Sequence, residues 1–161
     1  MNTKQLWTAL HYNPDTNAIF DGVYSKDRIK NLTLRPDVII CNTDDSDKPG
    51  EHWVVFYFKG HCLEFFDSLG RDITFYGESF VNFAKKFALV TKQCNKRTQD
   101  PKTALCGECC LYYIHMRVNG KSMEEIVNCI PPSVEIEDYV KTVYGVSADY
   151  VTPLLQNCVE C

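Results

Sequence analysis

Two short apolar runs in the middle of the chain predict a β-hairpin. Trp53–Phe58 (WVVFYF) and Cys62–Phe66 (CLEFF) are rich in β-branched and aromatic residues, a composition typical of strands. Three residues separate the runs, Gly60 among them, which favours a tight turn. Both faces of the runs are apolar, so we expect the hairpin inside a sheet and not at its edge. Asp37–Cys41 (DVIIC) predicts a further buried strand before an exposed loop.

Helical spacing of apolar residues occurs on either side of these strands. Near the N-terminus, Leu6, Trp7 and Leu10 predict the apolar side of a helix, which Asn13-Pro14-Asp15 ends. Four apolar residues predict a helix after the hairpin: Phe80, Phe83, Ala84 and Phe87. We expect a short strand at 88–90, directly after that helix.

The last third of the chain is predicted to be helical. Three helices are expected from their end signals: Cys106–Val118 before Asn119-Gly120, a second from the Ser122/Glu125 capping box to Pro131-Pro132, and a third from Ser133 to Gly145. Strands therefore cluster in the first half of the chain and helices in the second. This arrangement predicts an α+β fold with a central β-sheet flanked by helices.

Composition narrows the class of protein. The 161 residues contain no repeat, low-complexity tract or linker, so we predict a single domain over 1–161. No apolar run approaches the roughly 20 residues that a membrane span needs. The N-terminus also lacks the apolar stretch of a signal peptide. We therefore expect an intracellular protein that is not secreted and has no membrane partner.

The cysteines and the net charge exclude further classes. Nine cysteines is an odd count, which argues against a secreted disulfide framework, and Cys109, Cys110 and Cys129 are expected to be core residues. The net charge is −4, whereas a nucleic-acid-binding protein usually has a basic face, so we do not expect a nucleic acid as the partner. Two short-spaced pairs, Cys106/Cys109 and Cys158/Cys161, suggest zinc ligands. About fifty residues separate these pairs, so we predict no metal site.

The hairpin brings two ionisable residues together. If Lys59-Gly60 is a two-residue turn, Phe58 pairs with His61, and the same register places His52 opposite Asp67. Their Cβ atoms would then be about 5 Å apart on one face. A carboxylate at that distance accepts a hydrogen bond from one imidazole nitrogen and leaves the other free to act as a base.

Cys106 is the candidate nucleophile. A loop that contains Pro101 leads into an apolar helix, and Cys106 lies at the junction. The partial positive charge of a helix N-terminus stabilises a thiolate, and a neighbouring histidine lowers the thiol pKa further. Gln99, seven residues upstream, offers an amide to the developing oxyanion beside the backbone N–H of Cys106.

With these residues in place, the chain resembles the adenovirus maturation protease (adenain) family, which includes relatives in adenovirus-like viruses and Polinton/Maverick elements. The matching segments are Phe20–Tyr24 (FDGVY), Asn42-Thr43, Gly50–Trp53 (GEHW), Phe66–Gly70 (FDSLG), Gln99–Gly107 (QDPKTALCG) and Cys109-Cys110. The resemblance extends to about Gly120, and the remainder matches only as helix.

The resemblance implies a papain-like cysteine protease core in permuted order. His52 would be the base, Asp67 the residue that orients it, Cys106 the nucleophile and Gln99 part of the oxyanion hole. It also implies cleavage of viral precursor proteins after small residues, at Gly-Gly or Gly-X-Gly sites. Trp53 and Gly107 would line the substrate channel. Such an enzyme is expected to be a monomer in the virion and in the nucleus or cytoplasm of the host cell.

The chain departs from this family at the activation elements. The familiar viral enzyme is activated by a disulfide-linked peptide and by DNA. Here the stretch between Phe87 and Gln99 is short, and Cys94 lies closer to Gln99 than the peptide-linking cysteine of that enzyme does. The pI of about 5.5 also argues against DNA. We therefore expect no cofactor and carry over neither peptide nor DNA activation.

Two other functions remain open at this point. The SUMO-specific proteases of the Ulp type share His-Trp, an Asp-Ser-Leu turn and a Gln before Cys-Gly, which would make ubiquitin-like proteins the partners. They usually carry aspartate directly before the cysteine, where this chain has Leu105. The other function is a catalytically inactive module that grips glycine-rich tails. All four chemical positions are filled, which favours the enzyme.

Overall fold

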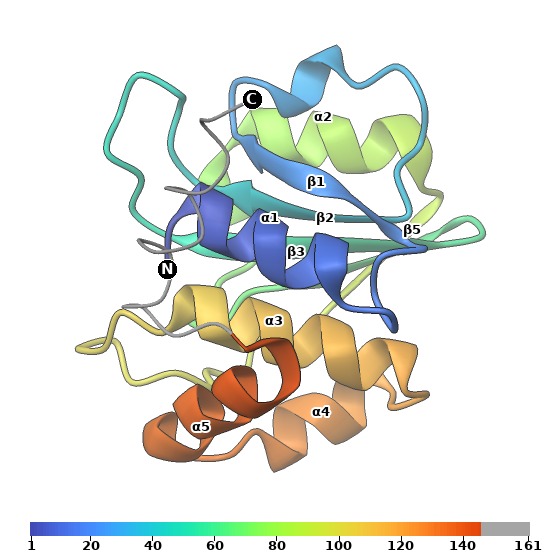
Figure 1. Ribbon diagram of the computed structural model, residues 1–161. Helices are drawn as coiled ribbons and strands as arrows, with labels where there is room; N and C mark the ends of the chain where they lie inside the picture. Colours follow the sequence, from blue (N-terminus) through green and yellow to red (C-terminus); the bar gives the residue numbers. More distant parts are fainter. Residues whose placement is uncertain (146–161) are drawn as a thin grey trace, which may run out of the picture.

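The computed structural model describes residues 1–145 as one mixed sheet with helices on both faces (Figure 1). Its five strands lie in the order β1-β2-β3-β4-β5: Phe20–Ser25, Val38–Asn42, Trp53–Lys59, Cys62–Phe66 and Val90–Gln93. The β2–β3 and β3–β4 pairs are antiparallel, whereas β1–β2 and β4–β5 are parallel. The predicted hairpin, β3–β4, is therefore in the interior of the sheet.

Five α-helices and two short 3-10 helices complete the described chain. The α-helices are α1 Thr3–Tyr12, α2 Glu78–Phe87, α3 Cys106–Val118, α4 Met123–Cys129 and α5 Ser133–Tyr144. The 3-10 helices are Ile29–Asn31 and Ile73–Tyr76. The predicted ends of the last three helices are confirmed, including the Ser122/Glu125 capping box and the left-handed Gly145. None of the helices between residues 1 and 145 has the length and apolar composition needed to cross a membrane.

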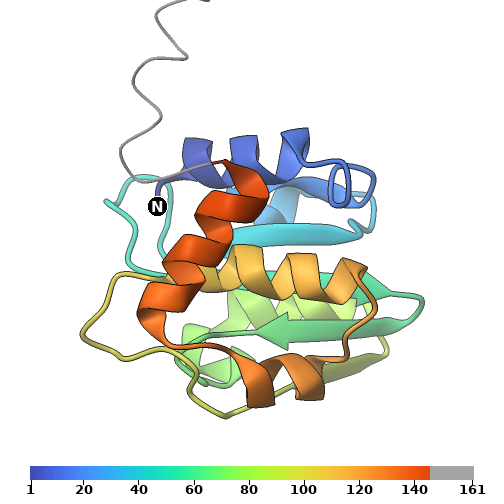
Figure 2. The same ribbon diagram turned by 60° about the horizontal axis from the view of Figure 1, so that its bottom comes forward.

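The sheet separates two hydrophobic clusters. Along β2, Val38 and Ile40 pack with α1 and α3, whereas Ile39 and Cys41 face the layer that contains α2. This alternation follows from the two-residue period of a strand. Figure 2 shows α5 crossing over α3, and both helices contribute to the larger cluster. Because both faces are covered, the central strands β2 and β3 are apolar on both sides.

The hairpin register differs from the predicted one. Lys59 pairs with Cys62 and Val55 with Phe66, so Gly60-His61 is the turn. Gly60 has φ +57°, and a type II′ turn takes glycine at this first central position. Moving the turn by one residue shifts every partner by two, which leaves each side chain on its original face. His52 and Asp67, which were predicted to lie directly opposite each other, are therefore diagonal neighbours on the same face.

Three other features were predicted wrongly or missed. Trp7 is exposed and stacks on His11, with 4.1 Å between ring centroids, instead of packing beside Leu6. The strand expected at 88–90 begins at Val90, because Ala88 caps the end of α2. Strand β1 was missed as an element. Its alternation is interrupted by a register shift between Phe20 and Gly22.

An ion pair fastens the sheet to α3 and gives a stability prediction. Arg117 Nε donates to Glu64 Oε2 at 2.7 Å and Nη2 donates to Oε1 at 3.1 Å, while the Tyr113 hydroxyl donates to the same carboxylate. The Arg117 and Glu64 side chains are 12% and 14% exposed. Glu64→Gln leaves the guanidinium charge largely buried and unpaired. We expect it to lower the free energy of unfolding by about 2–4 kcal/mol, measured by urea denaturation.

Asp138→Asn is the matched control for this change. Asp138 lies 4.0 Å from Lys141 with its side chain 73% exposed, and such surface pairs contribute about 0–1 kcal/mol. Equal losses for Glu64→Gln and Asp138→Asn would contradict a stabilising role for the pair between β4 and α3.

Candidate functional site

His52 lies directly before β3, at the end of a loop whose two ends are joined. The Thr43 N–H donates to the His52 carbonyl at 2.9 Å, which closes the loop 43–52. Asp27 anchors the middle of this loop by accepting from the Ser46 N–H and hydroxyl at 2.8 and 2.7 Å. The histidine is therefore buried and held at a strand end.

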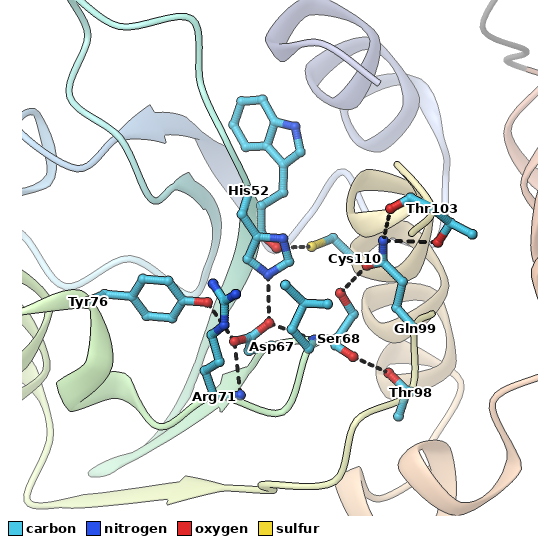
Figure 3. A network of polar contacts seen from close by, with 11 residues as sticks. His52, Asp67, Ser68, Arg71, Tyr76, Thr98, Gln99, Thr103 and Cys110 are labelled. Atoms are coloured by element: carbon cyan, nitrogen blue, oxygen red, sulfur yellow. Dashed lines mark hydrogen bonds and ion pairs between the residues drawn. The ribbon is translucent and has the colours of Figure 1, made fainter. Parts of the chain in front are cut away.

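Asp67 follows the last residue of β4 and is surrounded by donors (Figure 3). Its Oδ1 lies 2.6 Å from His52 Nε2 and accepts from the Leu69 N–H at 2.8 Å. Its Oδ2 accepts from the Arg71 N–H at 3.1 Å and from the Tyr76 hydroxyl at 2.6 Å. Burial raises the pKa of the Asp67 carboxyl, but the hydrogen bonds from His52 and Tyr76 outweigh burial and bring this pKa below its ordinary value. Asp67 is thus an ionised acceptor.

The turn that carries Asp67 requires glycine at its end. The Gly70 N–H donates to the Asp67 carbonyl, and Gly70 has φ +69°, a conformation unfavourable for other residues. A Cβ on Gly70 would lie 2.7 Å from the Arg97 backbone nitrogen. The segment 95–99 therefore packs directly on the turn, and this contact brings Gln99 to the site.

Cys106 is the first residue of α3, after Leu105 as the N-cap. Its N–H has no partner within the helix, because the first N–H groups of a helix never do. Burial raises the pKa of the Cys106 thiol, but hydrogen bonds with the His52 ring and the Trp53 backbone, together with the His52 charge, bring it below its ordinary value.

His52 is shifted in the opposite direction. Burial lowers the pKa of the imidazole, but its hydrogen bonds to Asp67 and Cys106 outweigh burial and raise this pKa to about 9. The two shifts are consistent with each other, since both favour a thiolate beside an imidazolium. Because Nε2 faces Asp67, Nδ1 is the nitrogen that remains for Cys106.

Gln99 is buried and its amide is fully engaged. Its Oε1 accepts from the Ser68 hydroxyl at 2.7 Å. Its Nε2 donates to the Thr103 carbonyl at 2.7 Å and is 3.2 Å from the Thr103 hydroxyl oxygen. The structure thus places the sequence-predicted His52 between Asp67 and Cys106. Figure 3 shows Gln99 against Thr103, in the loop that precedes Cys106.

The two residues expected to line the substrate channel have structural partners. Trp53 Nε1 donates to the Met1 carbonyl at 3.1 Å, and a Cβ on Gly107 would lie 3.0 Å from the Met1 Cβ. Gly107 therefore allows the N-terminal segment to approach α3. Trp53 also borders a cavity of about 430 Å³, whose wall includes Tyr24 and Lys48.

Three other cysteines of the described chain, Cys109, Cys110 and Cys129, lie in environments unlike that of Cys106. Burial raises the pKa of the Cys110 thiol well above its ordinary value and that of Cys109 to about 12, as expected of core thiols. Cys129, by contrast, is exposed, so its predicted core position is wrong. No group of three or more potential metal ligands occurs within residues 1–145. The second pair of the zinc hypothesis, Cys158 and Cys161, lies outside the described residues.

Sequence reasoning missed three residues that support this site. Tyr76 donates to Asp67 from a short 3-10 helix, and no periodicity marks it. Ser68 was interpreted only as part of a turn, although its position directly after Asp67 was a usable signal. Thr103 lies within the segment that matched the protease family, but only the fold shows that it faces Gln99.

Among the comparisons with known proteins, only the one with solved structures gives a match. No protein-family model matches the chain, and no curated protein matches it either. The chain is similar to the crystal structure of the ASFV pS273R protease, with a TM-score of 0.51 and 15% identity over 89% of this chain and 70% of that one.

A selenomethionine form of the same protease gives a TM-score of 0.47 and 20% identity, over 70% of this chain and 46% of that one. The alignment thus spans less than half of that neighbour. The observed elements and the likeness to the first structure confirm the predicted fold class, an α+β fold with a central sheet flanked by helices.

Proposed function

We propose that this chain is a cysteine endopeptidase of the adenovirus-maturation-protease type. The observation that carries the proposal is the position of His52, which is hydrogen-bonded to a buried carboxylate on one side and to a helix-terminal cysteine on the other. A base held between an orienting acid and a nucleophile is the arrangement that defines acyl-transfer triads, whatever their order in the chain.

The reaction follows from the protonation states of these groups. The Cys106 thiolate attacks the scissile carbonyl carbon, and the carbonyl oxygen becomes an oxyanion that the Cys106 N–H and Gln99 amide stabilise. The His52 imidazolium gives its proton to the leaving amine, which leaves a thioester. Neutral His52 then removes a proton from water, and the resulting hydroxide releases the acid and restores the thiolate.

The proposed substrates are precursor proteins with small residues before the scissile bond, at Gly-Gly or Gly-X-Gly sites. Trp53, fixed by its bond to the N-terminal segment, would form the wall that excludes larger side chains. A viral precursor is the preferred substrate because Leu105 stands where Ulp-type proteases usually carry aspartate. Ulp-type proteases share the Asp67-Ser68-Leu69 turn. This turn therefore supports a second candidate function, the removal of ubiquitin-like proteins at Gly-Gly tails.

Intact-mass analysis with a Gly-Gly peptide vinyl sulfone tests this function. We expect one adduct on the wild-type chain and on Cys109→Ala, and none on Cys106→Ala, because His52 lowers the thiol pKa of Cys106 whereas burial raises that of Cys109. Preferential labelling by a vinyl sulfone of a whole ubiquitin-like protein would favour the second candidate. No adduct, or equal labelling of the wild type and Cys106→Ala, would reject the protease.

A further inference from the structure

Ser68 links the turn of the orienting carboxylate to the segment that carries Gln99. It is fully buried and directly follows Asp67. Its carbonyl accepts from the Thr98 N–H at 2.8 Å and the Gln99 N–H at 3.0 Å, and the Thr98 hydroxyl adds a third bond at 3.2 Å. The backbone of Gln99 is thus fixed relative to the residue after Asp67.

The Ser68 hydroxyl and the Thr103 carbonyl together fix how the glutamine amide lies: the carbonyl sets its orientation and the hydroxyl holds its oxygen end. The Ser68 hydroxyl donates to Gln99 Oε1 at 2.7 Å, while Gln99 Nε2 donates to the Thr103 carbonyl at 2.7 Å. Rotating the amide by 180° would place Oε1 against that carbonyl, so two acceptors would face each other. A glutamine amide has nearly the same shape in both orientations, and its hydrogen bonds alone decide which one it takes.

We propose that Ser68 is a positioning residue for the oxyanion hole: its hydroxyl holds the Gln99 amide with the NH2 group toward the loop that leads into Cys106. The inference rests on the proposed acyl-transfer function. Thr103 precedes the nucleophile by three residues, so the NH2 group is held on the segment that leads into α3. The 3.2 Å contact to the Thr103 hydroxyl is the longer of the two Nε2 contacts, and an oxyanion would replace it.

The turn that contains Asp67 and Ser68 would then act on both the nucleophile and the oxyanion hole. Asp67 acts on His52 and therefore on the thiolate, whereas Ser68 acts on Gln99 and therefore on the oxyanion. The two effects have different readouts. Alkylation of Cys106 by iodoacetamide needs the thiolate but forms no oxyanion, while peptide cleavage and peptide-aldehyde binding need both.

The test compares Ser68→Ala with Thr98→Val, which removes a hydroxyl from the same contact but leaves the Gln99 amide untouched. For Ser68→Ala we expect kcat/KM for a glycine-rich peptide to fall about 10- to 100-fold. The affinity of a peptide aldehyde should fall in parallel. The rate and pH dependence of Cys106 alkylation should match the wild type, and Thr98→Val should leave all three readouts within about twofold.

A double-mutant cycle completes the test. Ser68→Ala combined with Gln99→Ala should be no slower than Gln99→Ala alone, since Ser68 acts only through the Gln99 amide. Unchanged cleavage by Ser68→Ala, additive losses in the cycle, or an equal fall in alkylation and cleavage would overturn the positioning role while leaving the protease intact. A wild-type chain that alkylates normally but neither cleaves peptides nor binds aldehydes would instead reject the proposed function.

Discussion

Replacing Asp67 with asparagine is expected to lower kcat/KM by about 10²- to 10³-fold without unfolding the chain. The carboxylate accepts four hydrogen bonds, two of them from the backbone N–H groups of Leu69 and Arg71. Asparagine has one oxygen, so its NH2 group must face one of these N–H donors. The imidazolium of His52 also loses its negative partner. The effect should be smaller than the ~10⁴-fold of the same change in a Ser-His-Asp triad, because the Cys106 thiolate still favours protonated His52.

The measurement is kcat/KM as a function of pH, with thermal unfolding as the check on folding. Because Asp67 raises the pKa of His52, Asp67→Asn should move the alkaline limb of the profile to lower pH. Asp72→Asn is the matched control, since the Asp72 carboxylate caps the 3-10 helix Ile73–Tyr76. Equal kcat/KM for Asp67→Asn and the parent would reject the orienting role.

The contact between His52 and Asp67 was predictable because it depends on the face of a strand and not on the exact register. The turn was placed one residue too early, and the partners shifted by two. A shift of two preserves the alternation, and a diagonal neighbour is still within reach of long side chains. The position of Cys106 at the start of a helix was also predictable, because the sequence signals for that helix start lie within a few residues of it.

The partners of the carboxylate and of the amide were not predictable in this way. Tyr76 reaches Asp67 from a short 3-10 helix, and Ser68 reaches Gln99 across 31 positions of the chain. Neither contact produces a period in the sequence. The contact of Ser68 with Gln99 depends on the packing of 95–99 over Gly70, which is a tertiary contact. Sequence reasoning therefore identified the candidate residues His52, Asp67, Cys106 and Gln99, but it missed Tyr76 and Ser68, which hold the carboxylate and the amide.

His52→Ala is expected to make the reactivity of Cys106 that of an ordinary buried thiol. In the wild type the thiolate is present above the lowered pKa of Cys106 and is lost as pH falls through it. The imidazolium is present below the raised pKa of His52 and is lost as pH rises through about 9. Peptide cleavage needs both ions, so its rate should fall on both sides of this window, whereas iodoacetamide alkylation should fall only on the acid side.

Without His52, burial is the largest remaining influence on the Cys106 thiol, and it raises the thiol pKa. An ordinary thiol with a pKa near 8.5 is only about 0.3% thiolate at pH 6, so alkylation there should fall by at least roughly 10-fold. Cleavage should be abolished at every pH, because no group remains to protonate the leaving amine. His61→Ala, in the exposed hairpin turn, is the control and should keep both profiles. An alkylation profile shared by His52→Ala and the wild type would show that Cys106 is activated without the histidine.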